Sequence, residues 1–231
     1  MLDLSSRWHQ PVEFAPKAVF FDLDGTLIDS MPDIEVAIQQ AAVKLGLPAP
    51  EASKVRTWIG NGAGALAARV LADSIDIPQQ QDPQYDALLA GYMHAYGELK
   101  HAYSSIYPGV KQWLQTLQEQ QVKLAVITNK AARFTPSILD HFGILQYFDE
   151  IYCGDTFSEK KPHPMPLLKA CEAFSIAPEQ ALMVGDSRND ILAAHNAGVR
   201  SLAVRGGYNH GEDINLSKPT WVVDSLEQVG I

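Results

Sequence analysis

The chain has 231 residues, of which 46% are hydrophobic and 19% charged. A chain of this length can bury about 72% of its surface, which excludes disordered, collagen-like and small disulfide-stapled proteins. Its 27 acidic and 18 basic residues give a net charge of −9. This charge argues against a nucleic-acid partner, because phosphate backbones bind basic surfaces. It does not exclude a small phosphate ester, which a single metal ion or cation cluster can bind.

Redox and targeting signals are sparse. Cys153 and Cys171 form no CxxC pair, so we expect reduced thiols and no disulfide or zinc site. The N-terminal residues lack the apolar stretch of a signal peptide. The longest apolar runs have only a few residues, well short of the ~20 that a membrane helix needs. These features predict a soluble cytoplasmic protein with no membrane partner.

The first predicted element is a strand at residues 18–21, a continuous apolar run that stops at Asp22. Residues 31–103 then contain no clear strand. Apolar residues at three- and four-residue spacing predict amphipathic helices at 34–45, 64–71 and 85–96. Because this helical insertion begins directly after the first strand end, it should lie over that end as a lid. We therefore predict a helical cap domain at 31–103 and a core formed by 1–30 and 104–231.

Strands and helices alternate through the rest of the chain. Helices are predicted at 110–117, 135–142, 166–174 and 189–197, and apolar strands at 124–127, 181–184, 201–204 and 221–223. This alternation is typical of a doubly wound, Rossmann-like α/β fold, in which helices cover both faces of a parallel sheet. Ligands of such folds bind outside the carboxyl ends of the strands.

Two carboxylates follow the first strand. Asp22 and Asp24 are two residues apart at its end, so their side chains should project in the same direction. Close like charges repel unless a cation lies between them, and Mg²⁺ is the natural hard, oxygen-binding choice. Gly25 allows a sharp turn. The alternative interpretation is a solvated acidic turn, which a preceding buried apolar run makes less attractive.

Polar residues also follow two later strands. Thr128 could donate to an anionic oxygen, although a strand-capping threonine is an alternative. Asp186 ends the strand 181–184, and Asp190 follows at a helix start, where a carboxylate could equally be a cap. Lys161 precedes Pro162, which disfavours helical geometry at the lysine; a solvated surface lysine is the alternative.

Together these groups suit metal-assisted phosphoryl transfer. In this hypothesis Asp22 attacks phosphorus and forms an acyl phosphate. Mg²⁺ lies between Asp22, Asp186 and a phosphoryl oxygen. Asp24 protonates the leaving alcohol and then activates water. Thr128 and Lys161 bind the oxygens of the transferring group.

The motifs resemble those of the haloacid dehalogenase superfamily, in the same order: Asp22-Leu23-Asp24-Gly25-Thr26, Thr128-Asn129, Lys161-Pro162, and Gly185-Asp186 with Asp190. The resemblance implies a doubly wound parallel sheet with an inserted helical cap. It also implies Mg²⁺ held by Asp22, Asp186 and the backbone carbonyl of Asp24, with Asp190 in support. An aspartate followed by Gly-Thr, as at Asp24, marks the phosphatase branch.

A narrower resemblance, from residue 17 to 223, is to the bacterial phosphoglycolate phosphatase family. It is carried by residues 56–62, 160–164, 185–190 and 207–209. It implies hydrolysis of 2-phosphoglycolate to glycolate and phosphate. We expect a monomer or homodimer. The alternatives on the same core are a phosphosugar phosphatase and a β-phosphoglucomutase-like enzyme.

The run Gly60-Asn61-Gly62-Ala63-Gly64 is not a dinucleotide-binding loop, because no strand precedes it. We expect a flexible cap loop that faces the active site, with Gly60, Asn61 and Arg56 as substrate-binding residues. Asn129, beside Thr128, is assigned to the substrate as well.

Two other classes of protein fit the sequence less well. A signalling receiver domain also uses an aspartate, a threonine and a lysine, but its order of motifs differs and it has no inserted cap. A non-catalytic interaction protein on this fold is disfavoured, because every expected catalytic residue type is present.

Overall fold

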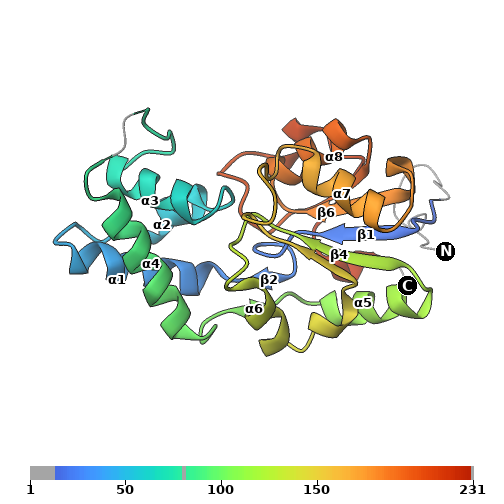
Figure 1. Ribbon diagram of the computed structural model, residues 1–231, viewed down its shortest axis with the longest axis horizontal. Helices are drawn as coiled ribbons and strands as arrows, with labels where there is room; N and C mark the ends of the chain where they lie inside the picture. The colour runs from blue at the N-terminus through green and yellow to red at the C-terminus, as the bar shows by residue number, and fades with distance from the viewer. Residues whose placement is uncertain (1–13, 80–81, 230–231) are drawn as a thin grey trace.

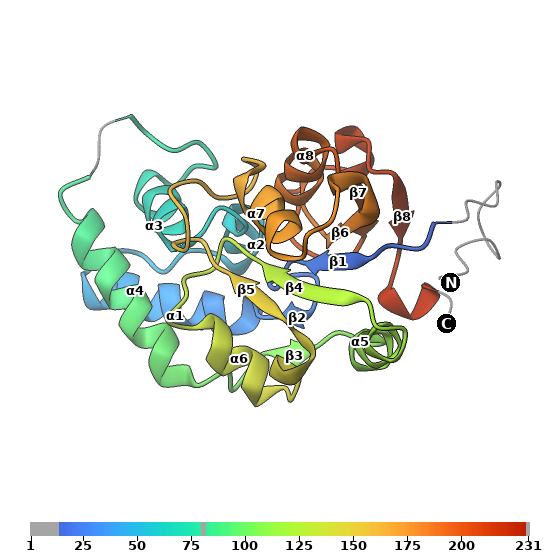
Figure 2. The ribbon, with the colours of Figure 1, turned by 45° about the vertical axis from the view of Figure 1, so that its right-hand side comes forward.

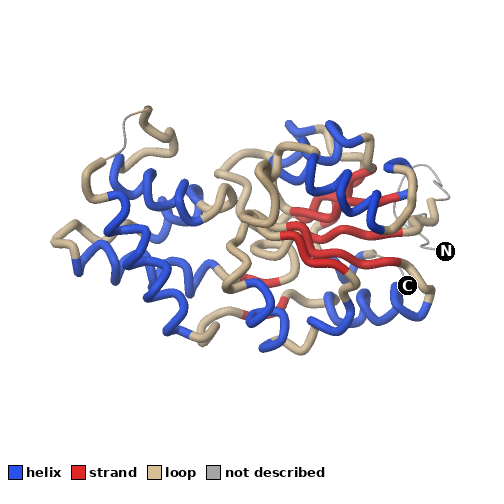
Figure 3. Tube along the Cα trace, in the orientation of Figure 1, coloured by secondary structure: helices blue, strands red, loops and turns tan. Residues whose placement is uncertain are grey.

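The computed structural model describes residues 14–79 and 82–229, so the first thirteen residues of the predicted core lie outside the description. A six-stranded sheet has the order β5-β4-β1-β6-β7-β8, and all its strand pairs are parallel. The α/β fold class is thereby confirmed (Figures 1 and 3). The strands are β1 (Ala18–Phe21), β4 (Lys123–Ile127), β5 (Glu150–Tyr152), β6 (Ala181–Gly185), β7 (Arg200–Val204) and β8 (Trp221–Val223).

Four helices cover the two faces of this sheet. They are α5 (Val110–Glu119), α6 (Thr135–His141), α7 (Met165–Ala173) and α8 (Arg188–Ala197). Figures 1 and 2 show α5 and α6 on one face and α7 and α8 on the other. Alternate residues of β1 explain the two layers: Val19 and Phe21 pack with the α5 and α6 side, whereas Ala18 and Phe20 pack with the α7 and α8 side. A strand buried on both faces needs the continuous apolar run seen in the sequence.

The two connections between the sheet and the helical insertion pair with each other. β2 (Ile28–Asp29) runs antiparallel to β3 (Ser105–Ile106). The pairing joins the residues just before 31 to those just after 103, so the insertion leaves and re-enters the core at one place. Neither short strand was predicted.

The insertion contains α1 (Met31–Lys44), α2 (Ala52–Trp58), α3 (Ala63–Ala72) and α4 (Tyr85–Leu99). These helices share a hydrophobic core that includes Ile38, Trp58, Leu66 and Leu88. They lie beyond the carboxyl ends of the strands (Figure 1). No strand interrupts 31–79 or 82–103, as predicted, although α2 was missed. Among the described helices, none is long and apolar enough to cross a bilayer.

Candidate active site

Three neighbouring strands bring the candidate residues together. β1 lies between β4 and β6, so Asp22, Thr128 and Asp186 follow adjacent strand ends. Backbone hydrogen bonds continue the strand pairing one residue past the ends of β1 and β4. Asp22 N–H donates to Val184 O, and Thr128 N–H donates to Tyr152 O, both at 2.9 Å. The sheet therefore fixes the backbone from which each side chain projects.

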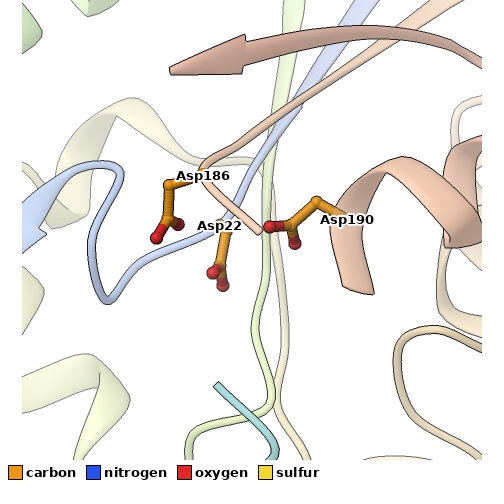
Figure 4. Close-up of side chains that lie close together, drawn as sticks. All are labelled: Asp22, Asp186 and Asp190. Atoms are coloured by element: carbon orange, nitrogen blue, oxygen red, sulfur yellow. The ribbon is translucent and has the colours of Figure 1, made fainter. Parts of the chain in front are cut away.

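Three carboxylates form a compact cluster. Asp22, Asp186 and Asp190 each offer an oxygen within 4.8 Å of the other two, and Figure 4 shows them converging. Burial raises the pKa of Asp22 to about 6, with Asp190 and Asp24 adding to the rise and Lys161 opposing it. Burial and the charges of Asp190 and Asp22 also raise the pKa of Asp186 well above its usual value. Such a cluster of hard oxygens fits a divalent cation, which would remove the repulsion.

Lys161 lies beside this cluster and is 2% exposed. Its Nζ is 2.6 Å from Asp190 Oδ1 and 2.8 Å from Asp22 Oδ1. The Lys161–Asp22 contact is an ion pair rather than a well-directed hydrogen bond, because no described residue donates to the buried Asp22 Oδ1 with hydrogen-bond geometry. Burial lowers the pKa of Lys161, but the two aspartates raise it more, and the net direction is upward. The lysine is a buried cation rather than a solvated one.

Asp190 has both oxygens occupied. Oδ1 accepts from Lys161, and Oδ2 accepts from the Ser187 backbone N–H and hydroxyl at 3.0 and 2.8 Å. The contacts with Ser187 are those of a helix cap at the start of α8. Asp190 thus caps the helix and pairs with Lys161, and its predicted support of a metal ion stays a prediction.

Asp186 is held by two donors. Thr26 Oγ1 donates to Oδ1 at 2.8 Å, and the backbone N–H of Tyr208 donates to Oδ2. A Cβ at Gly25 or Gly207 would overlap the Asp186 carboxylate, and Gly25 also has a φ of +93°. The close approach of both loops to Asp186 therefore requires glycine.

Asp24 pairs with Lys130 and is not part of the carboxylate cluster. Lys130 Nζ donates to Oδ1 at 2.9 Å and to Oδ2 at 3.1 Å, and Ser30 Oγ donates to Oδ1 at 2.6 Å. The Lys130 ammonium also lies 4.4 Å from the centre of the Tyr96 ring. Burial lowers the pKa of Lys130, but Asp24 and the tyrosines raise it more, so it is held above the usual value.

Comparison with known proteins supplies the family. The model of the family "Haloacid dehalogenase-like hydrolase" matches residues 19–204. The chain belongs to this family. It is 45% identical over 214 residues to phosphoglycolate phosphatase 1 of Pseudomonas aeruginosa, covering 93% of this chain and 78% of that protein. It is 44% identical to the phosphoglycolate phosphatase of Vibrio vulnificus strain YJ016, covering 92% of this chain and 94% of that protein.

A solved structure agrees with these relatives. A predicted phosphoglycolate phosphatase from Haemophilus somnus superposes with a TM-score of 0.85 at 38% identity, covering 93% of this chain and 96% of the other. The chain is therefore an enzyme of the phosphoric monoester hydrolase class.

The helical insertion of this haloacid dehalogenase-like hydrolase contacts the site through the loop at Gly60. Asn129 Nδ2 donates to Gly60 O and to Lys161 O, both at 2.9 Å. Asn189 Nδ2 also donates to Gly60 O, at 3.1 Å. Side chains from the loop after β4 and from the first turn of α8 thus bind one carbonyl of the insertion, which holds this loop over the strand ends.

The other two predicted cap residues, Asn61 and Arg56, are not among the residues that line the cavity containing Asp22. The Asn61 side chain donates a hydrogen bond to Asn189 and accepts one from Arg69. Its neighbours Gly60 and Gly62 do line the cavity. Arg56 donates to the carbonyls of Gly206 and Gly207 and lies over the Tyr208 ring. Their predicted contacts with substrate stay predictions.

The cavity of the hydrolase lies between the strand ends and the helical insertion, with a volume of about 50 Å³. Asp22, Asp24, Thr128 and Lys130 line its polar side. The remaining wall is mostly apolar and includes Ile34, Ile59, Leu66, Tyr92, Met93, Tyr96 and Phe134.

Sequence reasoning missed the parts played by Lys130 and by the backbone N–H of Tyr208. Lys130 follows directly after Thr128-Asn129, and Tyr208 follows the Gly206-Gly207 pair beyond β7. Their positions next to a motif and a glycine pair were the available signals. Their partners could not be identified, because Asp24 lies 106 residues from Lys130 along the chain.

Proposed function

We propose that the chain is a Mg²⁺-dependent phosphatase that hydrolyses 2-phosphoglycolate to glycolate and phosphate through a phosphorylated Asp22. The observation that carries the proposal is the meeting of Asp22, Asp186 and Lys161 at adjacent strand ends. The names of the relatives at 44–45% identity support this substrate. We further propose that residues 31–103 act as the cap that closes over it.

Asp22, Asp186 and the backbone carbonyl of Asp24 would hold Mg²⁺, which would neutralise the repulsion between the Asp22 carboxylate and the phosphate. The carboxylate cluster supports this assignment. Three buried carboxylates lie within 4.8 Å of one another, and among the described residues Lys161 is the one cation that pairs with them. Asp190 stays in its supporting place, since Lys161 and Ser187 occupy both of its oxygens.

In the first chemical step an oxygen of Asp22 attacks phosphorus and the phosphorus–ester bond breaks. The electron pair passes to the ester oxygen, which takes a proton from Asp24, and glycolate leaves. Thr128 and Lys161 bind the oxygens of the transferring group and stabilise the charge that spreads over them. The positive charge on Lys161 suits this task because it lies against Asp22 itself.

In the second step Asp24 takes a proton from a water molecule that attacks the phosphorus. The bond between phosphorus and Asp22 breaks, which restores the carboxylate and releases phosphate. The proton that Asp24 lost in the first step is thereby returned in the second. The apolar cavity wall keeps other water molecules away from the acyl phosphate.

The test is phosphate release from five esters, each with Mg²⁺ and with EDTA: 2-phosphoglycolate, 3-phosphoglycerate, glucose 1-phosphate, glucose 6-phosphate and p-nitrophenyl phosphate. We expect an EDTA-sensitive preference for 2-phosphoglycolate and no turnover by Asp22→Asn. A preference for the sugar phosphates would assign a phosphosugar phosphatase instead. Interconversion of the glucose phosphates without phosphate release would assign a mutase.

A further inference from the structure

Lys130 is the cation of the cavity that the proposed mechanism leaves without a task. Its side chain is 6% exposed, and its ammonium contacts both oxygens of Asp24. In this arrangement Asp24, whose carboxyl group must reach the ester oxygen, is bound to Lys130 instead. Ser30 also binds Asp24 Oδ1, so the acid–base residue is fixed in place.

The cavity favours a leaving group of one kind. Lys130 is the single basic side chain among the described residues that line it, and apolar groups make up most of the remaining wall. A leaving group with many hydroxyls would lose its hydrogen bonds to water against such a wall. A leaving group with one anionic end would gain a partner in Lys130.

We propose that Lys130 selects substrates whose leaving group carries a carboxylate beside the ester oxygen, and that it does so by exchanging partners. In the free enzyme the ammonium pairs with Asp24. When substrate binds, the ammonium pairs with the substrate carboxylate, and Asp24, released from the ammonium, takes up a proton from water and turns to the ester oxygen. This inference rests on the proposed function, because it concerns the leaving group of that reaction.

Covalent geometry supports the exchange. One methylene separates the carboxylate of 2-phosphoglycolate from its ester oxygen. The group that protonates the ester oxygen and the group that binds the carboxylate must therefore be neighbours. Asp24 and Lys130 are in contact at 2.9 Å and line the same cavity as Asp22. The exchange also keeps the buried ammonium paired with an anion throughout, which avoids the cost of an isolated buried charge.

The partner exchange has a kinetic consequence. A substrate without the carboxylate leaves Asp24 bound to Lys130, so its chemical step is slow even when the site is saturated. The carboxylate should therefore raise kcat and not merely lower KM. A binding contact that acts equally on the ground state and the transition state would change KM alone.

The test compares 2-phosphoglycolate with isobutyl phosphate, in which a neutral branched group of similar shape replaces the carboxylate. Both are assayed with Mg²⁺ on the wild type, Lys130→Met and Lys130→Arg. We expect the wild type to prefer 2-phosphoglycolate at least about 100-fold in kcat/KM, with at least about 10-fold in kcat. Lys130→Met should lose most of this preference, and Lys130→Arg should keep part of it. Lys123→Met is the matched control, because Lys123 forms an exposed ion pair with Asp149 at 2.7 Å; it should keep the wild-type ratio.

The outcomes separate the two proposals. A wild type that does not prefer 2-phosphoglycolate over the other esters overturns the proposed function. A wild type with that preference, together with an unchanged ratio in a folded Lys130→Met, overturns the selection by Lys130. Should Lys130→Met not fold, the wild type alone decides: equal kcat for both esters, with only KM different, overturns the partner exchange.

Discussion

Replacing Asp186 by asparagine should stabilise the metal-free protein. The Asp186 carboxylate lies within 4.8 Å of those of Asp22 and Asp190, and no described residue forms an ion pair with it. At that distance and an effective dielectric constant of about 20, each pair of charges repels by about 3.5 kcal/mol. Asparagine keeps oxygen and nitrogen atoms near Thr26 and the Tyr208 N–H, but loses about 1 kcal/mol of charge assistance at each contact.

Protonation of the wild-type carboxyls relieves part of this repulsion, so we expect a net gain of about 2 kcal/mol in the free energy of unfolding in EDTA at pH 8. For a chain of this size that gain corresponds to about 4–8 °C in Tm. Bound Mg²⁺ should favour the wild type over Asp186→Asn instead. At about 100 times its Kd, Mg²⁺ should stabilise the wild type by about 2.7 kcal/mol and Asp186→Asn far less.

The assay is urea unfolding with EDTA and with Mg²⁺, from pH 5 to 8. Because the folded-state pKa values of Asp22 and Asp186 are raised, these two carboxyls bind more protons in the folded chain than in the unfolded chain above pH ~4, and their contribution to wild-type stability falls as pH rises. The advantage of Asp186→Asn should therefore shrink toward pH 5. Asp224→Asn, which removes an exposed partner of Arg205, is the control. An Asp186→Asn protein that is less stable in EDTA, or equally stabilised by Mg²⁺, would refute the reasoning.

Three further predictions concern activity and metal binding. Asp24→Asn should slow hydrolysis of alkyl phosphates at least about 10-fold more than the first step with p-nitrophenyl phosphate, whose leaving group needs no acid; equal losses in rapid-mixing assays would argue against the acid. Gly207→Ala should weaken Mg²⁺ binding measured by calorimetry, since its Cβ overlaps the Asp186 carboxylate, whereas Gly97→Ala, where the nearest atom is 3.6 Å away, should not; equal affinities would show that the Gly207 loop moves freely. EDTA should abolish phosphate release and added Mg²⁺ should restore it; activity that survives exhaustive chelation would remove the metal from the mechanism.

Hydrophobic patterning predicted five of the six strands of the sheet well. β1, β4, β6, β7 and β8 lie within one residue of the predicted bounds, because strands buried on both faces need continuous apolar runs. β5 was missed because none of its three residues is fully buried and it forms no apolar run, whereas β8, the strand at the other edge, buries Trp221 and Val223. α2 was missed because its seven residues bury only Val55 and Trp58, too few to show a helical period.

The candidate site was predictable where the sheet itself places it. Parallel strands put Asp22, Thr128 and Asp186 at one edge whatever the loops do. The partners of Asp24 and the support of Asp186 were not predictable, because they depend on how loops fold back on the strand ends. Tyr208, for example, reaches Asp186 through a backbone N–H, a group that carries no signal in the residue type.

The phosphorylated Asp22 can be tested directly in Asp24→Asn. With p-nitrophenyl phosphate this variant should form the acyl phosphate, since the leaving group needs no proton, but it lacks the base that activates water for hydrolysis. Rapid mixing with Mg²⁺ should release a burst of about one nitrophenolate per active site. Borohydride reduction after acid quench should then convert residue 22 to homoserine, detected by peptide mass. Steady turnover without a burst, with residue 22 unmodified or another residue labelled, would contradict the mechanism.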